Sequence, residues 1–204
     1  SEMCIRDRTY HEVEQWFLGE SPKVDVTSPH LRYRSFIVDP ERNLVGDDLE
    51  ELIPLLLDNE RAACGFLYSG KITTWLEQSG NSKLSLYVDD IVKNKYPVDR
   101  HAGFMESIYT MAPDYPYKDV KGRDLRKVRD VVVSLLENID EYAVMLTNRN
   151  DNLWLYLETH TECAVDRMRG YFTNISGEAA GRHAVMRVVY ELDPGVPFIV
   201  GHKS

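Results

Sequence analysis

An apolar pattern in this sequence returns after 81 residues, and the repetition constrains the fold more than any other feature. Positions 72–117 align with positions 153–198 without a gap, although only six residues are identical. The matches gather at large apolar residues, as where Trp75 aligns with Tyr156. A repeat of this length is typical of a supersecondary unit that buries its apolar face against the next unit.

Shorter matches support the same division. An aromatic residue stands four positions before a proline in segments 36–40, 109–113 and 190–194. Segment 46–52 also resembles segment 122–128, at an offset of 76. We therefore predict two consecutive multi-helix repeat units of about 76–81 residues each. The alternative is that unrelated amphipathic helices with similar turns resemble one another.

Helical spacing of apolar residues runs through both units and predicts an all-α fold. Asp48 and Asp124 each stand two residues after a glycine and before an apolar helical pattern, so both are predicted N-caps. Glu51 would complete a capping box with Asp48. The further helices that we expect span about 60–68, 71–79, 82–95, 99–111, 140–147, 151–161, 162–174 and 177–192.

Two stretches also admit a β-hairpin, at 142–157 and at 188–200. We favour helix, because residues 176–190 are rich in Ala and Arg and fit the 3.6-residue period. The segments near 31–38 and 198–200 are the best candidates for short strands.

The chain divides into five predicted parts. Residues 1–8 resemble translated adapter sequence of the kind found at the ends of environmental gene fragments, and we expect this tail to be non-native. Residues 9–38 form an N-terminal segment that could end a preceding unit, and residues 39–112 form the first helical unit. Residues 113–193 form the second helical unit, and residues 194–204 begin a truncated third unit.

Charge and cysteine content narrow the partners and the setting. A net charge of −9 disfavours nucleic-acid binding, because phosphates are bound by basic surfaces. No apolar run approaches the roughly 20 residues that span a membrane. The three cysteines are too few and too scattered for a disulfide framework, which favours a reducing, cytoplasmic location.

No complete catalytic or metal-binding motif is present. His160 and Cys163 share the spacing of two ligands on one helical face, but structural zinc needs four. Cys64 lies in an apolar stretch that is typical of an inert buried thiol. The acidic clusters at 47–51 and 137–141 fit helix capping and solvated helix turns better than a cation site. We predict no catalytic residues, no metal and no cofactor.

The aromatic residues are the most suggestive feature. Tyr109 and Tyr190 repeat in position, and we expect both rings to be buried. Tyr115 and Tyr117 lie beside prolines and either pack one unit on the next or form a docking surface for a partner.

The function that this pattern favours is a helical-repeat protein-binding or scaffolding module, because stacked helices expose extended surfaces. We expect the chain to be a fragment of a longer protein. One alternative is an enzyme with its active site between the two units, which a concave pocket with titratable groups would indicate. A second alternative is a regulatory component of a multidomain protein.

Overall fold

A computed structural model describes residues 34–195, and within them the protein is mostly helical with two short antiparallel hairpins. The all-α prediction is therefore confirmed. The predictions for residues 1–33 and 196–204, including the strand near 198–200 and the non-native tail, lie outside the described residues.

The first half begins with a hairpin and continues in helices. Strand β1 pairs with β2 so that Phe36 lies opposite Gly46, with a bulge after Ile37. The elements of this half are β1 (Phe36–Asp39), β2 (Leu44–Gly46), α2 (Leu49–Asp58), α3 (Glu60–Tyr68), α4 (Lys71–Gln78), α5 (Ser82–Asp90), the π-helical turn η1 (Ile91–Lys95) and α6 (Arg100–Met111).

The second half has the same order of a hairpin followed by five helices. Its elements are β3 (Tyr117–Lys118), β4 (Asp124–Leu125), α7 (Val128–Glu137), α8 (Ile139–Met145), α9 (Asn152–His160), α10 (Val165–Gly170) and α11 (Glu178–Leu192). This recurring order is what a duplication would produce, and common ancestry of the halves stays a prediction. Each hairpin turn also holds an aspartate whose carboxylate accepts backbone N–H groups: Asp39 from Glu41 and Arg42, and Asp119 from Lys121 and Arg123.

The predicted N-cap is confirmed for α2 and wrong for α7. Asp48 caps α2, where its carboxylate accepts the Glu51 N–H at 2.9 Å. The Glu51 side chain reaches back to the N–H of Asp47, one residue before the N-cap. Asp124 is no N-cap, because it lies on β4 and α7 begins only after Lys127.

Two further sequence matches need correction. Segment 36–40 does not correspond to segment 109–113, because Phe36 lies on a strand whereas Tyr109 lies on a helix. The hairpin alternative at 142–157 is also wrong, since α8 and α9 occupy that stretch.

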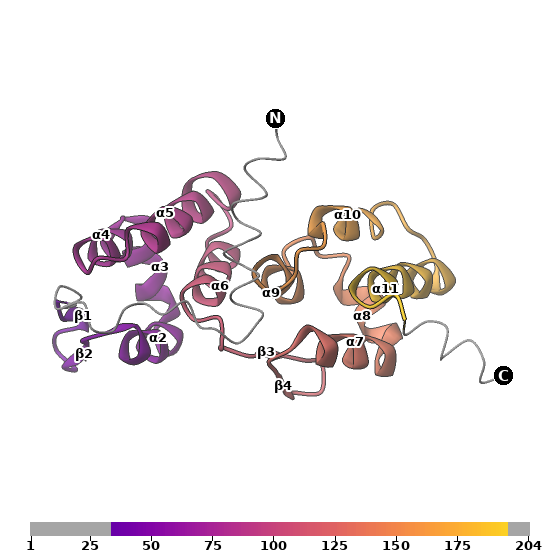
Figure 1. Cartoon of the computed structure of the whole chain (residues 1–204), viewed down its shortest axis with the longest axis horizontal. Helices are drawn as coiled ribbons and strands as arrows, with labels where there is room; N and C mark the ends of the chain where they lie inside the picture. The colour runs from indigo at the N-terminus through magenta and orange to yellow at the C-terminus, as the bar shows by residue number, and fades with distance from the viewer. Residues whose placement is uncertain (1–33, 196–204) are drawn as a thin grey trace.

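The two halves lie one after the other along the long axis of the molecule, and α6 and α9 face each other where they meet (Figure 1). Helix α6 is buried on all sides from Ala102 to Tyr109. Its counterpart α11 lies in the second half and keeps one side open. Tyr190 there is 49% exposed, against 2% for Tyr109, so the prediction that both rings are buried is wrong for Tyr190.

Candidate binding site

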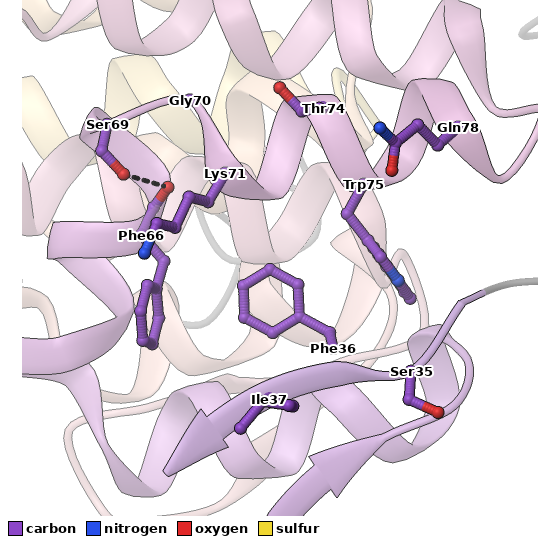
Figure 2. A pocket seen from close by; sticks show the side chains of 10 residues that line it. All are labelled: Ser35, Phe36, Ile37, Phe66, Ser69, Gly70, Lys71, Thr74, Trp75 and Gln78. Atoms are coloured by element: carbon purple, nitrogen blue, oxygen red, sulfur yellow. Dashed lines mark hydrogen bonds between the residues drawn. The ribbon is translucent and has the colours of Figure 1, made fainter. Parts of the chain in front are cut away.

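Three aromatic rings form the floor of an open pocket at the end of the first half. The ring of Phe36 lies between those of Phe66 and Trp75 (Figure 2). Both contacts are edge-to-face, with centroid separations of 5.4 Å to Phe66 and 5.8 Å to Trp75. This geometry places the positive edge of one ring against the negative face of the next, so the rings hold one another in place.

Local sequence explains why these rings meet. Phe36 and Val38 alternate along β1 with the exposed Ile37, so the strand turns its Phe36 side toward the helices. Trp75 lies on the buried side of α4, and its indole N–H donates to the carbonyl of Arg34 just before the strand. The hairpin packs tightly on α2, because a Cβ on Gly46 would come within 2.9 Å of the Leu52 Cα atom.

Polar groups surround the aromatic floor. The pocket has a volume of about 410 Å³, and its rim is made by Ser35, Ser69, Gly70, Lys71, Thr74 and Gln78. The Lys71 ammonium group lies 5.4 Å from the centroid of Phe66, in reach of a cation–π contact. An apolar floor with hydroxyl, amide and ammonium groups around it suits a ligand chain that inserts an apolar side chain and forms hydrogen bonds through its backbone.

Three aromatic rings also meet at the junction of the halves, and there they are buried. Tyr156 on α9 contacts Tyr117 of β3 at 5.8 Å and Tyr109 of α6 at 5.4 Å. Tyr117 is 2% exposed and Tyr115 is half-buried beside Tyr109. The Tyr117 ring is therefore covered in this structure, and contact of Tyr115 or Tyr117 with a partner stays a prediction.

Charged side chains also meet at the junction and bind one another. Glu106 of α6, 1% exposed, has its Oε2 atom 2.9 Å from the Lys95 Nζ atom. Arg169 of α10 donates to Glu158 at 2.7 Å and to the hydroxyl of Tyr96 at 3.2 Å. Burial, followed by the nearby Glu106 charge, raises the pKa of Tyr96 to about 12. Burial likewise raises the pKa of Glu106, against the attraction of Lys95.

The residues considered for metal binding have other contacts. The His160 Nε2 atom lies 2.7 Å from the Pro113 carbonyl, and Nδ1 lies 2.7 Å from the Thr159 hydroxyl. Because a carbonyl oxygen only accepts, the Nε2–H group donates to Pro113, and His160 connects α9 to the segment between the halves. The Cys163 thiol points to the Glu191 carbonyl. Within residues 34–195 no group of three or more His, Cys, Asp or Glu side chains could hold a metal ion.

The acidic clusters are engaged in local contacts. Asp47 accepts the Ser35 hydroxyl, and Asp48 caps α2. Glu137, Asp140 and Glu141 pair with Arg123, Arg182 and Lys121, respectively. None of the described helices is long and apolar enough to cross a membrane.

Sequence reasoning missed the pocket. The strand near 31–38 and the helix at 71–79 were predicted separately, and only the fold brings Phe36 against Trp75. A usable signal was the alignment at an offset of 81, which pairs Trp75 with Tyr156 and, extended upstream, Phe36 with Tyr117. In comparisons with known proteins, no family model, no curated protein and no solved structure matches the chain.

Proposed function

We propose that this chain is a helical-repeat protein-binding module, in which the aromatic pocket of the first half receives an apolar side chain from another protein. The observation that carries this proposal is an open pocket with three rings as its floor and hydrogen-bonding groups around it. Buried aromatic centres with polar surroundings are the usual anatomy of protein interfaces.

The chemistry of the pocket favours binding over catalysis. Of its ten lining residues, Lys71 alone carries a titratable side chain, so no acid and base face each other there. The titratable groups between the halves instead form ion pairs and hydrogen bonds with one another. A net charge of −9 favours a protein partner over a nucleic acid. A reducing, cytoplasmic setting fits the free thiols of Cys64 and Cys163.

Photo-crosslinking tests the proposal. The photoreactive residue p-benzoylphenylalanine replaces Thr74 at the exposed pocket rim, and in a control chain it replaces Asp58, which is exposed on α2 but does not line the pocket. Irradiation in cells should give a protein adduct from position 74 that is weak or missing from position 58. Mass spectrometry then identifies the attached protein.

The binding step is checked with the purified partner. Thr74→Arg places a long charged side chain at the rim and should weaken binding at least tenfold, whereas Asp58→Arg should leave binding unchanged. Equal adducts from both positions, or full affinity in Thr74→Arg, would overturn the proposal.

A further inference from the structure

The junction between the two halves consists of two complementary surfaces. One is a helix face on α6 that carries Tyr109. The other is the aromatic pair of Tyr117 on β3 and Tyr156 on α9, onto which Tyr109 packs. A repeat protein that joins its units in this way has one surface of the first kind uncovered at one end and one of the second kind uncovered at the other end.

The pocket is the receiving surface of the first half. Trp75 occupies on α4 the position of Tyr156 on α9, and Phe36 occupies on β1 the position of Tyr117 on β3, each at an offset of 81. The centroid separation is 5.8 Å in both pairs, although the ring planes meet at 78° in the first pair and at 38° in the second. The pocket therefore corresponds to the place at the junction where the α6 face packs against Tyr117 and Tyr156.

The inserting surface of the second half is the open side of α11. Helices α6 and α11 end at matched residues, Met111 and Leu192, at the same offset of 81. Four positions on this side are buried in α6 and open or half-open in α11. They are Ala102, Met105, Glu106 and Tyr109 in α6, and His183, Met186, Arg187 and Tyr190 in α11.

Charge supports a match between these two ends. At the junction, the positive charge of Arg169 on α10 attracts the carboxylate of Glu106 on α6. In α11 the position of Glu106 is taken by Arg187. The buried positions of α5 match those of α10 when the gapless alignment is shifted by one residue in this helix, to an offset of 80, since Ser85 and Val88 then correspond to Val165 and Met168. With this shift, Asp89, which also pairs with Lys93 of η1, stands at the position of Arg169. Both charges are then reversed and remain complementary.

Resting on the proposed function, we infer that the occupant of the pocket is the Tyr190 face of α11 from a second copy of this chain. The two copies associate head to tail, with Tyr190 of one against Phe36 and Trp75 of the other. Such a contact is heterologous, and each added copy presents a new open end, so association continues beyond a dimer.

Sedimentation velocity with paired variants of the full chain tests this geometry. Thr74→Arg blocks the pocket and leaves α11 intact, whereas Tyr190→Arg blocks α11 and leaves the pocket intact. Both side chains are exposed, so thermal unfolding should show that each variant folds. The controls are Asp58→Arg on α2, an exposed residue that does not line the pocket, and Val144→Arg on α8, where Val144 is 74% exposed.

The expected results are specific to a head-to-tail contact. The unmodified chain and both controls should sediment faster as concentration rises to about 1 mM, where even a contact with a Kd of 1 mM is half-populated. Each blocked variant alone should stay monomeric. An equimolar mixture of the two should form a dimer and nothing larger, because it contains one working contact.

The opposite results would overturn the inference. They are an unmodified chain that stays monomeric, association that persists in Tyr190→Arg, or a mixture that remains monomeric. A monomeric chain whose position 74 still crosslinks to a different protein would leave the proposed function standing. A chain that neither associates nor gives a position-specific adduct would overturn both.

Discussion

The ring of Tyr109 meets the ring of Tyr156 edge-to-face, with centroids 5.4 Å apart and planes at 84°. The two residues come from α6 and α9, so this contact joins the two halves of the chain. The His160 ring stacks on the Tyr156 ring with centroids 3.9 Å apart, and its Nε2–H group donates to the carbonyl of Pro113. The junction is thus an aromatic core with a hydrogen bond to the connecting segment.

Tyr109 and Tyr190 should differ sharply in their contribution to stability. Tyr109→Ala removes a ring that is 2% exposed and should lower the free energy of unfolding by about 3–5 kcal/mol. Tyr190→Ala removes a ring that is half exposed and should cost less than about 1 kcal/mol in a dilute sample. Urea unfolding followed by circular dichroism measures both changes. Similar losses for the two variants would show that α11 is covered in solution.

A second pair of variants tests a buried hydroxyl. In the described structure the Tyr156 hydroxyl is buried and has no hydrogen-bond partner, and burial raises its pKa to about 12. Tyr156→Phe should therefore leave stability unchanged or raise it by about 1 kcal/mol, because an unpaired buried hydroxyl is destabilising. The Tyr142 hydroxyl instead lies 2.8 Å from the Ser134 hydroxyl. Tyr142→Phe should lose about 1 kcal/mol in the same urea assay. A loss of that size in Tyr156→Phe would reveal a partner, such as a bound water.

The helices were predictable because their signals are local. Asp48 supplies the N-cap of α2, and the left-handed glycines Gly70 and Gly80 precede and follow α4. Periodic apolar residues between such signals then set the helix length. This is why α3 spans the predicted 60–68 and α6 begins one residue after the predicted start at 99.

The failures arose where distant contacts decide the structure. Asp124 resembles Asp48 in sequence, but pairing of Lys118 with Asp124 draws it into a hairpin. Tyr190 resembles Tyr109, but its exposure depends on whether another unit covers α11, which its own helix cannot encode. The pocket depends likewise on a strand and a helix, β1 and α4, with 31 residues between them in the chain.

A third prediction concerns the close approach of α6 to α3. A Cβ atom on Gly103 would come within 2.1 Å of the Tyr68 hydroxyl oxygen, which donates to the Tyr96 carbonyl at 2.6 Å. Gly103→Ala should therefore destabilise the protein by about 1–3 kcal/mol, the usual range for overpacking, despite the better helix propensity of Ala.

A double-mutant cycle isolates this cause. Tyr68→Phe removes the oxygen and leaves the nearest ring carbon 3.1 Å from the new methyl group, so Gly103→Ala should cost clearly less in that background. Equal costs in the two backgrounds would mean that the clash with Tyr68 is relieved without strain.

The last prediction links stability to pH through Asp119, a buried carboxylate. It accepts hydrogen bonds from the N–H groups of Lys121 and Arg123, from the Arg123 side chain and from the Ser134 hydroxyl. Burial favours the protonated acid, but these hydrogen bonds outweigh it and lower the pKa of Asp119 below its ordinary value. Stability from this group is therefore present above the unfolded-state pKa, about 3.9, and is lost as pH falls through the lower folded-state pKa.

Asp119→Asn should accordingly lower the free energy of unfolding by about 2–4 kcal/mol at pH 7, because its amide NH₂ group would face hydrogen-bond donors that the carboxylate accepts. The difference in unfolding free energy between variant and parent should narrow as pH falls below about 4, because the unfolded parent binds a proton at Asp119 there and the variant cannot. Asp124→Asn is the matched control, since that carboxylate is 51% exposed and 3.9 Å from Lys118, a pair worth little. Urea unfolding at pH 7, 5 and 3 measures all three chains. A gap between Asp119→Asn and the parent that stays constant over this range would show that ionised Asp119 contributes nothing specific to the fold.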